Sequence, residues 1–324
     1  MPKAIRFGKT GGPEVLQWED VEVGAPGPGE AQVRHKAVGV NFVDTYNRSG
    51  LYKHPLPSGL GAEGAGVVEA VGAGVTHVKV GDRVAYGTGP LGAYAEVRNM
   101  PAERLCNLPE GISFEQGASM MLQGMTVQYL IKRIYPVKAG ETVLWHAAAG
   151  GVGQIACQWL KALGVTVIGT AGSDEKCALA KSLGADHVIN YRTENFVERV
   201  HAITGGARVP VVYDSVGKDT WLGSLDCLRP RGLMVSFGNA SGPVTGVDLG
   251  ILTAKGSLFV TRPTLANYAG TRADLEATSK DLFDIVLSGK VKIDISSTYP
   301  LKDAAKAHSD LESRKTTGSL ILIP

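Results

Sequence analysis

The sequence predicts an α/β protein in which a doubly wound parallel sheet follows a β-rich segment. Three observations predict this fold class. Short strands broken by Gly and Pro fill the first 122 residues, strands and helices alternate from about residue 124, and a glycine-rich turn joins one of those strands to its helix. Strands that alternate with crossover helices form a parallel sheet with helices on both faces.

The N-terminal part is expected to be largely β. Short apolar segments between turn residues predict strands at 21–23, 30–40, 63–71, 83–86 and 93–97. Residues 1–5 lead into a further strand-like segment and do not resemble a signal peptide, so we expect a cytoplasmic protein.

The alternating part begins with a predicted helix at 123–135. The strands that follow are expected at 142–146, 165–170, 187–190, 209–214, 232–236 and 257–261, and the helices between them at 154–163, 174–183, 195–204 and 220–227. A helix at 272–288, the stretch 290–301, a helix at 302–313 and a strand at 318–323 close the chain. We expect this C-terminal segment to return to the first domain.

The turn after the strand at 142–146 carries the pattern A-x-G-x-x-G, with Ala148, Gly150 and Gly153, and Gly151 in addition. Glycines at these positions permit a tight turn, a close approach of backbone N–H groups to a pyrophosphate, and close contact between helix and strand. The helix N-terminus further favours anionic phosphate. The sequence therefore predicts a dinucleotide site.

The end of the second strand favours NADPH over NADH. NAD enzymes usually place an acid there for the ribose hydroxyls, but this strand ends in Thr170-Ala171-Gly172. Asp174 and Glu175 come later and are expected to be first-turn acids of a helix capped by Ser173. Lys176 in the same turn suits a 2′-phosphate; the alternative is that it points into water and pairs with an acid.

Composition excludes several function classes. The chain has 324 residues, enough for two domains, and a net charge of +2 without Lys/Arg runs, so no nucleic-acid partner is expected. No uninterrupted apolar stretch reaches the roughly 18 residues of a membrane span. The four cysteines lie far apart and predict neither a zinc ribbon nor a disulfide framework.

Several segments together resemble the medium-chain dehydrogenase/reductase superfamily, and within it the zinc-independent, NADPH-dependent quinone oxidoreductases that include zeta-crystallin. The resemblance covers essentially the whole chain. Its most specific segments are NFVDTYNRSGLY at 41–52, LPSGLGAEGAGVV at 56–68, VGDRVAY at 80–86, HAAAGGVGQIACQWLKALG at 146–164, VVYDSVG at 211–217, RGLMVSFGNASG at 231–242 and the terminal LESRKTTGSLILIP.

The resemblance implies that a Rossmann NADPH-binding domain, residues 123–264, is inserted into a GroES-like catalytic domain, residues 1–122 plus 265–324. It also implies a homodimer joined through the strand at 257–261, whose apolar edge is unguarded by charge.

Zinc-bearing relatives place a cysteine where this chain has Asn41, and a histidine where Gly61-Ala62-Glu63 has Ala62. Four close cysteines for a structural zinc are also missing, so no metal is predicted. Without a metal ion to act as a Lewis acid, the hydride acceptor must already be electrophilic. This favours a quinone as the substrate and, after it, an activated enone. Glu63 and His146 are expected to be buried structural residues.

The residues expected at the catalytic site are Asn41, Tyr46, Tyr52, Gln123 and Thr126. Asn41 can donate or accept through its amide, and the tyrosines offer flat apolar surface plus a hydroxyl. The alternatives are that the two tyrosines are loop residues capping the β domain, and that Gln123 and Thr126 are polar residues at a helix start.

The residues expected to bind the cofactor are Asn41, Tyr46, Thr126, Gly150, Gly151, Val152, Gly153, Gly172, Ser173, Lys176, Tyr191, Val216, Phe237, Gly238, Pro263, Leu265 and Arg314. Tyr191 could instead be an aromatic residue at a sheet end, and Arg314 a solvated cation at a helix end.

Two other functions remain open. One is an NADPH-dependent reductase of the C=C bond of enones or alkenals. The other is a nucleotide-dependent RNA-binding or structural protein without turnover, against which stand the absent basic stripe and the cleft tyrosines.

Overall fold

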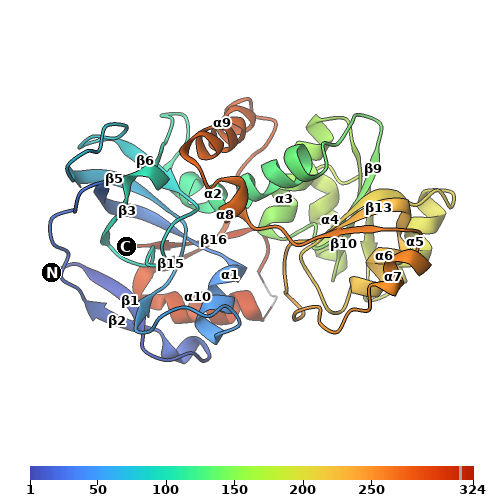
Figure 1. The fold of residues 1–324 in the computed structure, drawn as a ribbon, viewed down its shortest axis with the longest axis horizontal. Coiled ribbons are helices and arrows are strands. Elements are labelled where there is room, and N and C mark those ends of the chain that lie inside the picture. Colours follow the sequence, from blue (N-terminus) through green and yellow to red (C-terminus); the bar gives the residue numbers. More distant parts are fainter. Residues whose placement is uncertain (314–315) are drawn as a thin grey trace. The chain divides into compact units, whose positions relative to one another are not determined.

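The computed structural model describes residues 1–313 and 316–324 and divides into two compact units (Figure 1). Unit 1 comprises Met1–Met125, Tyr268–Ser288 and Ile293–Pro324, and unit 2 comprises Thr126–Asn267 and Gly289–Lys292. Both chain termini therefore belong to unit 1. No helix among the described residues is long and apolar enough to cross a bilayer.

Unit 1 is built on two β-sheets. Its smaller sheet has the strand order β2-β1-β4, and its larger sheet has the order β15-β16-β3-β5-β6-β8 with β7 paired to β3. The strands are β1 (Lys3–Phe7), β2 (Gln17–Asp20), β3 (Glu30–Val40), β4 (Ser58–Gly59), β5 (Gly64–Val71), β6 (Arg83–Tyr86), β7 (Val97–Pro101), β8 (Cys106–Asn107), β15 (Ile295–Pro300) and β16 (Ser319–Ile323).

The C-terminal strand β16 pairs antiparallel with β3, through Leu320 opposite Val40, so the end of the chain completes the N-terminal sheet. The helices of this part are α1 (Phe42–Ser49), α2 (Phe114–Tyr129, which runs on into unit 2), α9 (Arg272–Leu287) and α10 (Ala304–Glu312), with short 3₁₀ turns at Pro13–Val15, Ala102–Arg104 and Leu301–Asp303. Apolar side chains from β1, β3, β5 and α10 form one buried core.

Unit 2 is a parallel sheet with the strand order β11-β10-β9-β12-β13-β14. Numbered from its first strand, this is the 3-2-1-4-5-6 order of doubly wound folds, with the switch point between β9 and β12. The strands are β9 (Thr142–Trp145), β10 (Thr166–Ala171), β11 (His187–Asn190), β12 (Val209–Asp214), β13 (Leu228–Ser236) and β14 (Phe259–Thr261).

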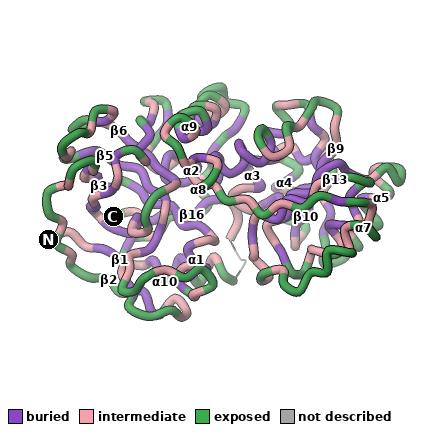
Figure 2. The backbone as a smooth tube through the Cα atoms, viewed as in Figure 1, coloured by how far each residue is buried: buried purple, intermediate pink, exposed green. Residues whose placement is uncertain are grey.

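The sheet of unit 2 is covered by crossover helices. They are α3 (Gly151–Ala162), α4 (Asp174–Ser182), α5 (Phe196–Ile203) and α6 (Trp221–Asp226), followed by α7 (Gly250–Ala254) and α8 (Leu265–Tyr268); a π-helical turn, Leu130–Ile134, extends α2. Residues of β10 are largely buried (Figure 2), and every residue of β12 is buried, as expected when both faces of a parallel sheet are covered.

Two predicted strands are misplaced. The stretch 21–23 is not a strand, and the segment that pairs with β1 is β2 instead. In this register the residue opposite Val21 is Pro2, which has no N–H to donate, so the pairing cannot continue. The strand predicted at 93–97 begins only at Val97, since Ala93 and Tyr94 hydrogen-bond to the loop carbonyls of Gly61 and Leu60.

The helix predicted at 123–135 begins earlier, at Phe114. Ser113 and Gln116 form a reciprocal cap there: Gln116 N donates to Ser113 Oγ, 3.2 Å, and Ser113 N donates to Gln116 Oε1, 3.0 Å. Gln123 and Thr126 therefore lie inside the helix, and the alternative that they cap its start is wrong.

Candidate functional site

The glycine turn of unit 2 leaves the N-terminus of α3 open to a ligand. Gly150 is the N-cap and no side chain caps the helix, so the first backbone N–H groups, from Gly151 to Gly153, keep their anion-binding capacity. A Cβ on Gly153 would lie 2.4 Å from the Ala147 carbonyl oxygen, so only glycine permits this close approach. Ala147 itself has φ +53°, a strained conformation of the kind found at functional turns. These residues fit a pyrophosphate.

The loop after β10 brings together the residues predicted around the 2′-phosphate. Ser173 caps α4, its Oγ accepting from Lys176 N at 3.3 Å, as predicted. Tyr191, 44% exposed, lies directly over Gly172: a Cβ at Gly172 would be 2.4 Å from the Tyr191 hydroxyl. Asp174 accepts from Asn190 Nδ2 at 2.8 Å, so this first-turn acid is engaged within the protein.

The loops after β12 and β13 hold Val216, Phe237 and Gly238. Asp214 Oδ1 accepts from Val216 N at 2.8 Å, which fixes the first loop. Gly238 approaches the Ser215 carbonyl so closely that a Cβ would lie 2.3 Å from its oxygen. Pro263 follows β14 and Leu265 begins α8. Arg314 lies outside the described residues.

In unit 1, Asn41 belongs to a buried chain of hydrogen bonds. Its Nδ2 donates to Glu63 Oε2 at 2.5 Å, and its Oδ1 accepts from Gln123 Nε2 at 3.1 Å. Glu63 Oε1 also accepts from Leu122 N, 2.8 Å, and Ser319 Oγ lies 3.0 Å from Gln123 Oε1. The structure thus brings Asn41 and Gln123 together; Thr126 lies further along α2, in unit 2.

Two carboxyl groups at this cluster are fully buried. Burial raises the pKa of Glu63 to about 8, opposed by its hydrogen bonds to Asn41 and Leu122 and reinforced by nearby Asp44. Burial likewise raises the pKa of Asp44 to about 7. Gly39 makes room for Glu63, because a Cβ there would lie 2.3 Å from Glu63 Oε2. The burial of Glu63 is as the sequence predicts.

The predicted tyrosines lie around α1. Tyr46 is in the helix and buried, so the alternative that it is a loop residue is wrong. Asn41 precedes the helix, where its N donates to Asp44 Oδ2 at 2.8 Å, and Gly50 ends the helix at φ +87°. Tyr52 follows the helix and is 38% exposed. The Tyr46 and Tyr52 rings meet edge to face, with centroids 5.4 Å apart.

A second buried network, which the sequence did not predict, links Asp44 and Arg48 of α1 to Tyr94 and His308. Tyr94 Oη donates to Asp44 Oδ2 at 3.0 Å and lies 3.0 Å from His308 Nε2; Arg48 Nη1 lies 2.9 Å from His308 Nδ1. Arginine cannot accept, so it donates to Nδ1 and His308 is neutral with its proton on Nε2. Burial, followed by the Arg48 charge, lowers the pKa of His308 to about 3.

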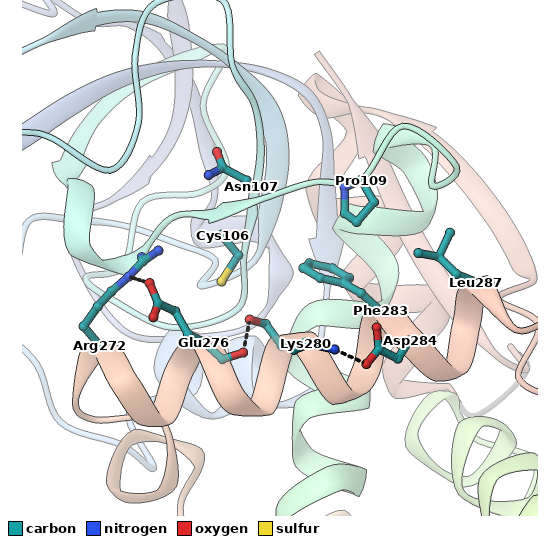
Figure 3. A pocket seen from close by; sticks show the side chains of 10 residues that line it. Cys106, Asn107, Pro109, Arg272, Glu276, Lys280, Phe283, Asp284 and Leu287 are labelled. Atoms are coloured by element: carbon teal, nitrogen blue, oxygen red, sulfur yellow. Dashed lines mark hydrogen bonds and ion pairs between the residues drawn. The ribbon is translucent and has the colours of Figure 1, made fainter.

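A pocket of about 330 Å³ in unit 1 lies between β8 and α9 (Figure 3). Cys106 and Phe283 line it, beside the Arg272–Glu276 and Lys280–Asp284 ion pairs of α9. None of the predicted site residues lines this pocket. Elsewhere, the described residues include no cluster of three His, Cys, Asp or Glu suited to a metal.

Comparisons with known proteins cover nearly the whole chain. A family model described as zinc-binding dehydrogenase matches residues 151–280, and one described as alcohol dehydrogenase GroES-like domain matches residues 27–110. The chain is 58% identical to a quinone oxidoreductase of Pseudomonas aeruginosa, over 100% of both chains, and 49% identical to a 2-haloacrylate reductase of a Burkholderia species, over 100% of this chain and 99% of that one.

Among solved structures, Escherichia coli quinone oxidoreductase complexed with NADPH matches with a TM-score of 0.98 at 57% identity, covering 99% of this chain and 100% of that one.

Proposed function

The chain belongs to the medium-chain dehydrogenase/reductase family, and we propose that it is an NADPH-dependent quinone reductase that works without a metal. The observation that carries the proposal is the uncapped N-terminus of α3 at the switch point of the parallel sheet. It is supported by the quinone oxidoreductases of P. aeruginosa and E. coli, the latter complexed with NADPH.

In this proposal, unit 2 holds the cofactor. The N–H groups of Gly151 to Gly153 bind the pyrophosphate, and Lys176 and Tyr191 receive the 2′-phosphate beside Gly172. When bound, NADPH supplies a hydride, or electrons in steps, from its nicotinamide ring.

Unit 1 supplies the groups for the acceptor. An amide nitrogen carries two N–H donors, and Glu63 takes one of those of Asn41; among the described residues, the second has no partner. We assign that N–H to the quinone oxygen, where it stabilises the negative charge that develops during reduction. Tyr52 and Tyr46 offer aromatic faces to a flat acceptor, and in this proposal the Tyr52 hydroxyl also donates to an acceptor oxygen. Gln123 fixes the Asn41 amide by donating to its Oδ1.

A second candidate function is reduction of the C=C bond of an enone or alkenal. The 49% identity to a 2-haloacrylate reductase favours it specifically, since a haloacrylate carries an activated C=C bond. The third reading, a nucleotide-dependent RNA-binding or structural protein, predicts NADPH binding without turnover.

The test is the rate of NADPH oxidation by the purified protein with 1,4-benzoquinone, a naphthoquinone and an alkenal in parallel. Quinone reduction at least tenfold faster than alkenal reduction supports the proposal. The reverse order favours the C=C reductase, and tight NADPH binding with no oxidation of NADPH by any acceptor favours the third reading.

We also propose a homodimer joined through β14. Phe259 and Val260 on this edge strand are 62% and 39% exposed, and an apolar edge strand is a surface for pairing. Sedimentation of the wild type against Phe259→Lys tests it, since the charge should shift the protein to monomer. The cytoplasmic location stays a prediction of the sequence.

A further inference from the structure

A buried hydrogen-bond chain joins the ends of three adjacent strands in unit 2. His146 Nδ1 lies 2.9 Å from Thr170 Oγ1, and His146 Nε2 lies 3.0 Å from Ser224 Oγ. Ser224 Oγ donates to Asp214 Oδ2 at 2.8 Å. None of these four side chains is more than 1% exposed. His146 follows β9, Thr170 is near the end of β10 and Asp214 ends β12, and β10, β9 and β12 are neighbours in the sheet.

The donors and acceptors fix the direction of every bond in this chain. Asp214 accepts four hydrogen bonds, from the backbone N–H groups of Val216 and Gly217 and from the hydroxyls of Thr220 and Ser224, so its carboxylate has no proton to give. The Ser224 hydroxyl therefore donates to Asp214 and accepts from His146 Nε2.

The imidazole of His146 is neutral, since burial lowers its pKa. Its proton lies on Nε2, facing Ser224, so Nδ1 accepts from the hydroxyl of Thr170. The chain runs in one sense, from Thr170 through His146 and Ser224 to Asp214. A change at any member leaves a buried polar atom without a partner.

Each anchored strand end leads into one of the loops assigned to the cofactor. His146 precedes the strained Ala147 and the turn to Gly150, where Ala148 N donates to the Thr170 carbonyl at 3.0 Å. Thr170 itself precedes Gly172 and Ser173. Asp214 holds Val216 and Gly217 through their N–H groups. The first loop leads directly into Gly151–Gly153, whose N–H groups are assigned to the pyrophosphate. The second loop holds Gly172, beside the assigned 2′-phosphate, and the third holds Val216, which the sequence predicts to bind the cofactor.

We propose that His146 is a positioning residue for the dinucleotide, which locks the loops at 147–150, 171–173 and 215–217 into one arrangement before NADPH binds. The inference rests on the proposed function, because it takes these loops as the cofactor site. Loops that are fixed in advance lose less conformational freedom on binding, so the ligand binds more tightly. An apolar side chain at 146 would fill the core equally well but would leave the three loops uncoupled.

The test measures the Kd of NADPH by fluorescence titration for the wild type and for His146→Leu, His146→Gln and the control His35→Leu. We expect His146→Leu to raise the Kd at least tenfold. His146→Gln should raise it less, since its amide can still donate to Ser224. His35 matches His146 as a buried histidine with two hydrogen bonds, to Ala95 O and Tyr86 Oη, but lies in unit 1. His35→Leu should lower Tm and leave the Kd within twofold.

Coupling through His146 is tested with smaller changes, which also carry the test if His146→Leu does not fold. Thr170→Val and Ser224→Ala do not contact each other, so independent effects on the Kd would multiply in the double variant. We expect the double variant to bind NADPH no more weakly than the weaker single variant, within twofold. Fold-changes that multiply overturn the inference.

Hydrogen exchange on the cofactor-free protein gives a readout that is independent of activity. In Ser224→Ala, amides of all three loops should exchange faster together, whereas a purely local role would affect only 215–217. If the wild type fails to bind NADPH, the proposed function itself is wrong. If the wild type binds and His146→Leu binds within twofold, only the positioning role is wrong.

Discussion

Replacing Glu63 with Gln should remove a pH-dependent loss of stability. The Glu63 carboxyl is fully buried, and burial raises its pKa from 4.5 to about 8. Between these values the folded protein keeps a proton that the unfolded chain releases, so the free energy of unfolding falls as pH rises. At about 1.36 kcal/mol per pH unit, the loss from pH 5.5 to pH 9 is about 3 kcal/mol.

The Glu63→Gln variant should fold because the amide chain around this position can reverse. The introduced Gln side chain would accept from Leu122 N through its oxygen and donate to Asn41 through its nitrogen. The Asn41 amide must therefore flip, so that Asn41 Oδ1 faces the introduced Gln. Gln123 then turns as well, donating through Nε2 to Ser319, which keeps its own proton for the Ser119 carbonyl, 3.2 Å from Ser319 Oγ. Each hydrogen bond between these side chains keeps a donor and an acceptor in the reversed arrangement, so at pH 5.5 we expect stability within about 1 kcal/mol of the wild type.

The assay is urea unfolding followed by circular dichroism at pH 5.5, 7 and 9. The wild type should lose about 3 kcal/mol more than Glu63→Gln between the two extremes. Asp44, whose pKa burial also raises, contributes to both proteins with the same sign and cancels in the comparison. Glu110→Gln, at an exposed position, controls for the loss of one negative charge. Equal losses in the wild type and Glu63→Gln would refute a raised pKa at Glu63.

Three further outcomes are expected. Lys176→Ala should reduce the preference for NADPH over NADH at least tenfold, about 1.4 kcal/mol, and similar Michaelis constants of the wild type for both cofactors would contradict the 2′-phosphate assignment. Tyr52→Phe and Asn41→Ala should each lower quinone turnover at least tenfold in steady-state assays; wild-type rates in both would remove these residues from the site. Arg48→Met should lower the free energy of unfolding by roughly 2 kcal/mol in urea, because buried His308 Nδ1 loses its donor, and an unchanged value would show that the network is not stabilising.

The α/β fold class and the family were predictable because their patterns are local. The strand Val209–Asp214 and the residue opening α4 match the prediction, since an apolar run and a Ser cap each act within one turn or strand. Errors arose where contacts with residues distant in the sequence determine the secondary structure. The stretch 21–23 alternates like a strand but meets Pro2, and α1 was missed although Asn41, Asp44 and Gly50 carry its start and end.

The site was predictable only in part, for the same reason. Asn41 was found because it replaces an expected ligand, but its partners Glu63, Gln123 and, beyond them, Ser319 are separated along the chain and join only in the folded sheet. Those contacts determine which hydrogen-bonding groups of Asn41 remain available to an acceptor, which the sequence alone could not show. The Asn41 oxygen already accepts from Gln123, and one of its two N–H groups is taken by Glu63. What Asn41 can offer an acceptor is therefore a single N–H, suited to a developing oxyanion and unsuited to a proton-donating role, so the proton that completes quinone reduction must come from another group or from solvent.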